Sequence, residues 1–149
     1  MSEIQMEIAA QGEVVRTVLV HLENGKISDA TACFAEKFAF QDRGIGLEFK
    51  NRERLAEFFQ KTRELYPDSS LQTDTILVSG EHVITEWTLK TTITEPFYGG
   101  LSRKVPVSLH GASIVRIDNG KIIDWSDYYD GSTSRRAALA SYFTEWVGL

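Results

Sequence analysis

The stretch DNGKIIDWSDYYD, residues 118–130, predicts a β-hairpin and decides the class of fold expected for this chain. Asn119-Gly120 is the strongest hairpin signal in the sequence, because the favoured two-residue turn needs positive φ at both positions, which Asn and Gly tolerate. On both sides of the turn the side chains alternate with a period of two, as they do in a strand. We therefore expect neighbouring strands at about residues 103–118 and 121–130.

The strand periodicity extends upstream to Pro67, where the spacing of apolar residues changes from about 3.6 to two. Two more strands are predicted at about residues 70–78 and 82–95, joined by the turn pair Ser79-Gly80. Four strands linked by turns indicate an antiparallel sheet, with no parallel crossover.

Residues 1–25 have the pattern of an amphipathic helix, with Asn24-Gly25 as its C-terminal stop. Apolar side chains recur at steps of three and four, which places them on one face. That face comprises Ile4, Ile8, Val15, Val18, Leu19 and Leu22.

Shorter elements lie between this helix and the strands. Ser28 is expected to cap a short second helix that carries residues 32–34 inward, and residues 38–42 alternate like a short strand. A third helix is predicted from its cap at Asn51 to Pro67, whose ring cannot continue a helix.

The order of elements predicts a single α+β domain spanning residues 1–149. Three helices cover one face of a strongly curved antiparallel sheet, and a last helix is expected at about 133–146. Such a sheet backed by helices forms a cone, and its open end is the natural place for an apolar pocket.

Composition supports one compact domain and excludes several functional classes. The chain has 149 residues, 42% of them hydrophobic, and a formal net charge of -5. Scattered basic residues and an acidic balance argue against nucleic-acid binding. No apolar run approaches the roughly 20 residues of a membrane span, and no leader pattern is seen, so we expect a cytoplasmic protein. No metal or cofactor motif is present, and we predict no cofactor.

Alternation along the strands predicts which side chains face the helices. If Trp87 faces inward, Leu89 does too, and the neighbouring strand turns Ser113 inward and His110 outward. On the last strand, Asp127 lies between the inward-facing Trp125 and Tyr129. Burying a carboxylate costs several kcal/mol unless it is paired or hydrogen-bonded, so Asp127 is a candidate functional residue.

Two segments carry a family resemblance that covers nearly the whole chain: LENGKISDATACFAEKFAFQD, residues 22–42, and the stretch at 118–130. The chain resembles the cone-shaped superfamily of nuclear-transport-factor-2-like proteins. This superfamily includes ketosteroid isomerases, limonene-epoxide hydrolases and SnoaL-type polyketide cyclases. The resemblance implies that Asp42 matches the proton-shuttling Asp of the isomerases. It also implies that Asp127 matches the water-activating Asp of the epoxide hydrolases and lies close to the acid/base Asp of the cyclases.

The chain departs from the two best-defined sites of that superfamily. The oxyanion hole of the isomerases is formed by a Tyr and a protonated Asp, and these positions correspond here to Val18 and Ser113. The Arg and second Asp of the epoxide hydrolase relay correspond to Trp87 and Leu89, and its water-holding Tyr corresponds to Phe40. These departures argue against classical steroid isomerisation and against epoxide hydrolysis by that relay.

The leading hypothesis is a cofactor-independent enzyme of the isomerase or cyclase type that moves a proton on an apolar carbonyl compound, polycyclic compounds included. Asp127 would be the principal acid/base and Asp42 a second one, while Ser113 and Tyr129 would polarise a substrate oxygen. Two carboxylates in an aromatic cavity cannot both ionise easily, so one pKa should rise toward neutrality. The remaining substrate-binding residues would be Phe40, Trp87, Leu89 and Trp125.

Other interpretations stay open at this stage. Asp42 precedes Arg-Gly and fits an ordinary turn residue, and the aromatic side chains fit plain core packing. The chain could then be a non-catalytic module that binds a small ligand or forms dimers. A third alternative is a dehydratase or hydrolase that uses Asp127 with His110, which requires a β-bulge near Gly111 to turn His110 inward.

The outer face of the sheet is expected to be too apolar for a fully solvated surface, which suggests a homodimer through the sheets. By alternation this face carries Ile84, Glu86, Thr88, His110, Ile114, Ile122 and Tyr128.

Overall fold

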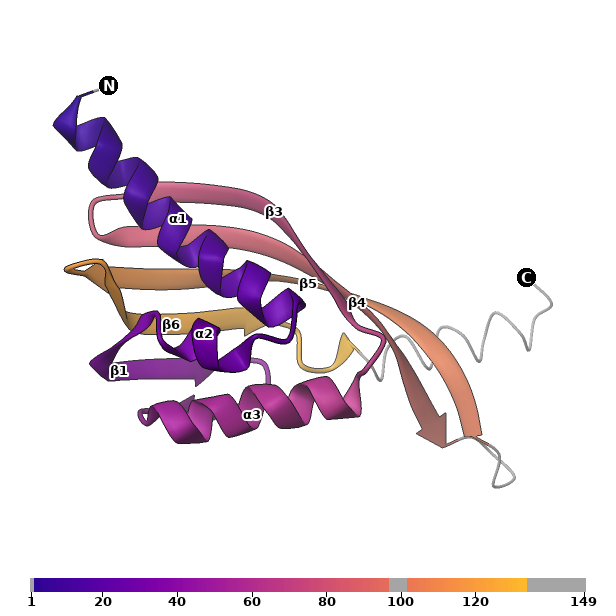
Figure 1. The fold of residues 1–149 in the computed structure, drawn as a ribbon. Coiled ribbons are helices and arrows are strands. Elements are labelled where there is room, and N and C mark those ends of the chain that lie inside the picture. Colours follow the sequence, from indigo (N-terminus) through magenta and orange to yellow (C-terminus); the bar gives the residue numbers. More distant parts are fainter. Residues whose placement is uncertain (1, 97–101, 134–149) are drawn as a thin grey trace.

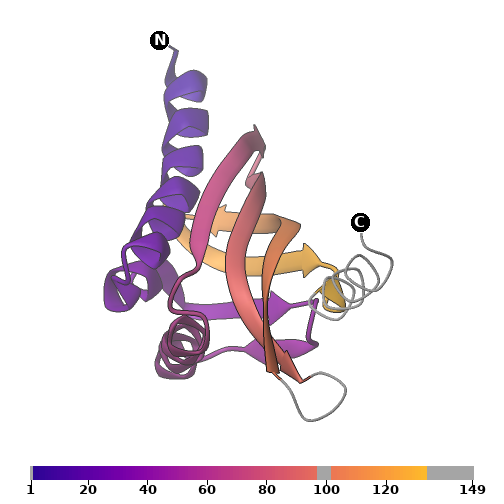
Figure 2. The ribbon, with the colours of Figure 1, turned by 90° about the vertical axis from the view of Figure 1, so that its right-hand side faces the viewer.

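A computed structural model describes residues 2–96 and 102–133 and shows three helices on one side of a curved, six-stranded sheet (Figures 1 and 2). The predicted α+β class is thereby confirmed. The predicted helix at 133–146 lies almost entirely outside the described residues. The elements are α1 (Glu3–Glu23), α2 (Ile27–Thr31), β1 (Phe34–Asp42), β2 (Leu47–Phe49), α3 (Arg52–Leu65), β3 (Ser70–Ser79), β4 (His82–Pro96), β5 (Ser102–Asp118) and β6 (Lys121–Tyr129).

The strand order in the sheet is β2-β1-β6-β5-β4-β3. Four long strands from β3 to β6 form the antiparallel meander that the alternation predicted. Asn119 and Gly120 have φ values of 50° and 73°, as the predicted hairpin turn requires. The expectation of a wholly antiparallel sheet is wrong at one pair, because β1 runs parallel to β6. Parallel pairing needs a long connection, and here β1 is joined to β6 through β2, α3 and strands β3 to β5.

The segment between α1 and α3 differs from the prediction at three points. The second helix begins at Ile27 after Lys26, with no side-chain cap, so Ser28 is not its N-cap. Strand β1 begins at Phe34 rather than Phe38, because Phe34 pairs with Ile122 of β6. Strand β2 was not predicted, since three residues are too few for a periodic signal.

Helix ends follow the predicted capping chemistry in the longer helices. The Asn51 side chain accepts a hydrogen bond from the Arg54 backbone N–H at 3.1 Å and starts α3. Helix α1 ends at Glu23 with Asn24 as its C-cap, and Gly25 follows with φ of 72°. Ile4 and Ile8 are exposed, because only the C-terminal part of α1 packs closely on the sheet (Figure 1).

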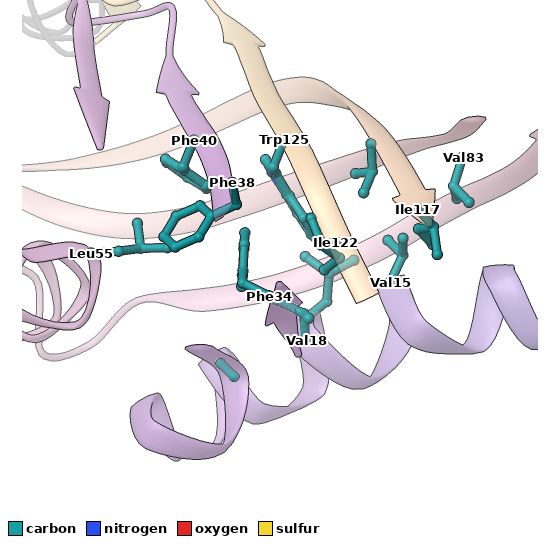
Figure 3. Packing of buried hydrophobic residues seen from close by; sticks show 13 residues of the cluster. Val15, Val18, Phe34, Phe38, Phe40, Leu55, Val83, Ile117, Ile122 and Trp125 are labelled. Atoms are coloured by element: carbon teal, nitrogen blue, oxygen red, sulfur yellow. The ribbon is translucent and has the colours of Figure 1, made fainter. Parts of the chain in front are cut away.

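The core lies between the sheet and the helices, where aromatic rings of β1 and β6 meet α1 and α3 (Figure 3). The ring centroids of Phe34 and Phe38 are 5.0 Å apart, and Phe40 stacks on Trp125 at 6.3 Å. Ile122 belongs to this core with no exposed surface, although alternation placed it on the outer face. A register shift between Arg116 and Ile117 adds a residue to β6 and turns Ile122 inward. In the described part of the chain, no helix is long and apolar enough to cross a membrane.

Candidate functional site

A cavity of about 450 Å³ lies between the concave face of the sheet and helices α1 and α3. Both predicted carboxylates, Asp42 and Asp127, line it. All six predicted substrate-binding residues line it as well: Phe40, Trp87, Leu89, Ser113, Trp125 and Tyr129. Their position is therefore as expected, while their chemical roles remain predictions.

Strand register brings these side chains together from four strands. Asp127 of β6 is the direct neighbour of Asp42 across the parallel pair and of Ser113 across the antiparallel pair. Two residues before Ser113 in β5, Gly111 is paired with Trp87 of β4 on one side and with Tyr129 of β6 on the other. The cavity wall is thus a small patch of adjacent inward-facing positions, because residues paired across strands share a face.

Asp127 is hydrogen-bonded through one carboxylate oxygen. Its Oδ1 accepts from the Ser113 hydroxyl at 2.5 Å and from the Trp125 indole N–H at 2.6 Å. The Trp87 indole N–H in turn donates to Ser113 Oγ at 2.9 Å. The other oxygen, Oδ2, has no hydrogen-bond partner among the described residues. Within the described part of the chain, Asp127 thus has one oxygen held by two donors and one that accepts from none.

Burial raises the pKa of Asp127 to about 6, well above the 3.8 of an unperturbed aspartate. The hydrogen bonds from Ser113 and Trp125 oppose this rise because they stabilise the ionised form, and the negative charge of Asp42 adds to it. One pKa was expected to rise toward neutrality, and Asp127 is the carboxyl in which this occurs. Near pH 7 such a group can both accept and return a proton.

Asp42 ends β1 and is buried, with 7% of its surface exposed. Its Oδ1 accepts hydrogen bonds from the backbone N–H groups of Gly44 and Ile45, each at 3.1 Å. The turn contact that was considered for this residue is therefore present, and the same carboxylate also lines the cavity. Asp42 stands where β1 ends and the turn to β2 begins, and it is paired in register with Asp127 of β6.

Tyr129 stands beside Asp42 with its ring over the β1–β2 turn. Burial raises the pKa of Tyr129, and the hydrogen bond to Asp42 with the nearby negative charges raises it further, so the phenol stays protonated. A Cβ at Gly44 would overlap the Tyr129 ring, so only glycine leaves room for it there. Sequence analysis missed this contact, because it joins residues 85 positions apart.

The role expected for Ser113 needs correction. Ser113 is fully buried, and its single hydroxyl proton is donated to Asp127. It was expected to polarise a substrate oxygen, but its hydroxyl proton is engaged within the site. Ser113 therefore holds Asp127 in place.

His110 lies on the outer face of the sheet, as alternation predicted. Its side chain is exposed, and its Nδ1 is 3.1 Å from Thr88 Oγ1. The pairing of β4 with β5 is regular through Gly111, so no bulge turns His110 inward. The dehydratase or hydrolase alternative with His110 therefore loses its structural basis.

Two charged residues at the cavity were missed by sequence analysis. Glu23 ends α1 and Arg63 lies in the last turn of α3. Arg63 Nη1 donates to the carbonyls of Leu22 and Glu23, both at 3.3 Å, and so ties α3 to the end of α1. Both residues lie on helices, and for helices the spacing of apolar residues predicts only the face that is buried. Among the residues described, no three His, Cys, Asp or Glu side chains are grouped to hold a metal ion.

The fold is that of ketosteroid isomerase-like and nuclear-transport-factor-2-like proteins, as comparison with solved structures shows. A Catenulispora acidiphila protein of ketosteroid isomerase-like fold, solved with trimethylamine, has a TM-score of 0.71 at 19% identity over 84% of this chain and 91% of its own. An epoxide hydrolase of M. tuberculosis that is similar to limonene-epoxide hydrolase has a TM-score of 0.71 at 19% identity, covering 96% and 99%. IdmH from Streptomyces antibioticus, a proposed polyketide cyclase, has a TM-score of 0.73 at 17% identity, covering 86% and 97%.

The sequence itself assigns the chain to a family within this fold. The model of the SnoaL-like polyketide cyclases matches residues 12–138, and the chain belongs to that family. A search of curated protein sequences finds no match.

Proposed function

We propose that this chain is a cofactor-independent proton-transfer enzyme of the isomerase or cyclase type that acts on an apolar carbonyl compound in the cavity. The observation that carries the proposal is the state of Asp127. One of its oxygens is held by two donors, the other has no described partner, and its pKa is about 6. A carboxyl that is positioned in this way at a cavity wall suits general acid–base catalysis near neutral pH. Membership of the SnoaL-like family supports the reaction class.

The proposed reaction begins with the ionised Asp127. Its carboxylate removes a proton from a carbon next to the substrate carbonyl, and the C–H electron pair becomes part of an enolate. In an isomerisation, protonated Asp127 then returns the proton to a different carbon. In a cyclisation, the enolate carbon bonds to a second carbonyl carbon of the same molecule, whose oxygen takes the proton from Asp127. Either route leaves Asp127 ionised again, with all atoms and charges accounted for.

The other residues of the site receive supporting roles in this proposal. Asp42 is the second acid/base candidate. Its share of the proton transfer is smaller, because its Oδ1 already accepts hydrogen bonds from two backbone N–H groups. Tyr129 remains the candidate donor to the enolate oxygen: its phenol stays protonated, and its single proton would turn from Asp42 to the substrate oxygen when a ligand enters the cavity. Phe40, Leu89 and Trp125 would form the apolar wall against which a flat substrate lies.

The test measures proton removal directly and needs no knowledge of the final product. The protein is incubated in D₂O with a panel of polycyclic ketones, and deuterium incorporation next to the carbonyl is followed by NMR. The wild-type chain should accelerate exchange for at least one panel member, and Asp127→Asn should lower that rate by roughly 100-fold or more. Asp118→Asn, which changes an exposed carboxylate at the far end of β5, is the control and should leave the rate unchanged. Equal exchange rates for the wild type and Asp127→Asn would remove the assignment.

The second candidate function is a non-catalytic module that binds a small apolar ligand. The observation in its favour is that Asp42 and Ser113 are engaged in hydrogen bonds within the protein. The same ketone panel separates the two functions when binding is measured by fluorescence of the tryptophans at the cavity. A ligand that binds equally to the wild type and Asp127→Asn, without deuterium exchange in either, would identify the module.

We further propose that two copies of the chain associate through the outer sheet face. Four exposed apolar residues support this, namely Leu77, Ile84, Ile114 and Tyr128. Leu77 pairs with Ile84, and Ile84 with Ile114, so three of them form a continuous row across three strands. Both signs of charge flank this face, in Glu86 and Arg116, so a two-fold arrangement can bring opposite charges together.

The test of this association is the mass in solution. Light scattering should give twice 16.8 kDa for the wild type. Ile114→Asp should give the single-chain mass, because it places a charge at the centre of the apolar row. Val20→Asp, which alters a similarly exposed apolar residue on α1, is the matched control and should remain a dimer. A wild-type chain that is monomeric at about 100 μM would refute the association, since stable dimers of standard interface size form well below that concentration.

A further inference from the structure

Three side chains form a directed line of hydrogen bonds that ends at Asp127. The Trp87 indole N–H donates to Ser113 Oγ at 2.9 Å, and the Ser113 hydroxyl donates to Asp127 Oδ1 at 2.5 Å. Trp87 and Ser113 are both buried. An indole N–H can only donate, whereas a hydroxyl can donate and accept. The ionised Asp127 can only accept, so the Ser113 proton goes to Oδ1, and the Trp87 N–H occupies a lone pair of Ser113 Oγ and holds the hydroxyl in this orientation.

The direction of this line determines which oxygen of Asp127 can carry a proton. Oδ1 already accepts from Ser113 and from the Trp125 N–H at 2.6 Å. A proton on Oδ1 would have to displace one of these donors, and a buried donor without an acceptor is costly. Oδ2 has no described partner, so protonation there breaks no hydrogen bond to residues 2–96 or 102–133.

The chain makes specific room for Trp87. Gly111 of β5 is paired with Trp87, and a Cβ at position 111 would overlap the indole ring. The ring lies over this glycine and reaches Ser113, which is two residues further along the same strand. The absence of a side chain at position 111 is thus a condition for the indole N–H to meet Ser113 Oγ.

We propose that Trp87 is a positioning residue that acts on Asp127 through the Ser113 hydroxyl, keeping that hydroxyl a donor to Oδ1 and leaving Oδ2 as the oxygen that takes and returns the proton. The catalytic part of this statement rests on the proposed function, since Oδ2 is reactive only if Asp127 is the acid/base. The hydrogen-bond part stands without it. Trp87 does not itself donate to the substrate, because its one N–H is given to Ser113.

Other ionisable groups face Asp127 and must be held constant in a test. Asp42 lies on the neighbouring strand β1, and Tyr129 lies two residues along β6. Asp42 contributes a negative charge close to Asp127, and Tyr129 contributes a protonated phenol. The variants below leave both residues in place, so changes in the Asp127 pKa report on its donors.

The experiment is a double-mutant cycle on the Asp127 pKa, measured by NMR titration of ¹³C-labelled aspartate carboxyl groups, with Asp127→Asn identifying the signal. Ser113→Ala removes a donor to the ionised carboxylate and should raise the pKa by about one unit. Trp87→Phe keeps a ring but frees the hydroxyl, and should raise it by roughly half a unit. In the Ser113→Ala background, Trp87→Phe should cause no further rise. Trp125→Phe, which removes a direct donor, is the control and should raise the pKa in both backgrounds.

The proposal is overturned if Trp87→Phe raises the Asp127 pKa equally in the wild-type and Ser113→Ala backgrounds. It is also overturned if Trp87→Phe raises that pKa in neither background. If Trp87→Phe disturbs the fold, Trp87 can be replaced by benzothienylalanine, which keeps the ring shape and lacks only the N–H. These titrations need no substrate. If the pKa changes contradict the expected pattern but wild-type deuterium exchange is intact, only the role of Trp87 is refuted. If the pKa changes follow the expected pattern but the wild type shows no deuterium exchange, only the proposed function is refuted.

Discussion

Replacing Asp127 by Asn should stabilise the protein at neutral pH, and the size of the effect follows from the pKa of this carboxyl. Asp127 ionises with a pKa of about 6 when folded, against 3.8 when unperturbed. Between these two pH values the folded chain binds more protons than the unfolded chain, so stability falls as pH rises from about 4 to about 6. Above pH 6 the folded protein bears the full free-energy cost of burying the ionised Asp127 carboxylate. At about 1.36 kcal/mol per unit, a shift from 3.8 to about 6 corresponds to at most about 3 kcal/mol.

Asparagine keeps an oxygen that can accept from Ser113 and Trp125 and carries no charge to bury. Urea unfolding of the wild type and Asp127→Asn at about pH 7.5, 5 and 4 measures the difference at each pH, and contributions of other groups cancel. We expect the variant to be more stable by about 2–3 kcal/mol at the highest pH, with the difference vanishing near about pH 4. Asp118→Asn, which changes an exposed carboxylate, should show no such pH dependence. A variant that is less stable at the highest pH, or a difference independent of pH, would refute the reasoning.

Three further predictions test the surroundings of Asp127. Gly111→Ala should lower the free energy of unfolding by about 1–3 kcal/mol in urea, because its Cβ overlaps the buried Trp87 ring; an unchanged stability would mean that the ring has free space. His110→Ala should leave deuterium exchange within about twofold of the wild type, since His110 is on the outer face; a large loss would restore the His110 hypothesis. Tyr129→Phe should lower that exchange rate roughly 10-fold by removing the phenol, and an unchanged rate would leave Tyr129 a packing residue only.

Much of the fold could be predicted because the signals are local. The change from helical to strand spacing at Pro67, the Asn119-Gly120 turn and the cap at Asn51 each depend on neighbours in the chain. Alternation also placed Trp87, Ser113 and Asp127 at the cavity and His110 outside. It failed where a register shift adds a residue, as at Ile122.

The class of fold, the extent of the long strands and the side of the sheet on which each candidate lies could be read from the amino-acid sequence, because turn chemistry and side-chain period are properties of short segments. The parallel pairing of β1 with β6, which sets Asp42 beside Asp127, became visible in the folded chain and not before. The tertiary structure alone decided that Ser113 gives its proton to Asp127 rather than to a ligand. Such choices depend on the register between distant strands and on the direction of hydrogen bonds between them, and no local pattern records either.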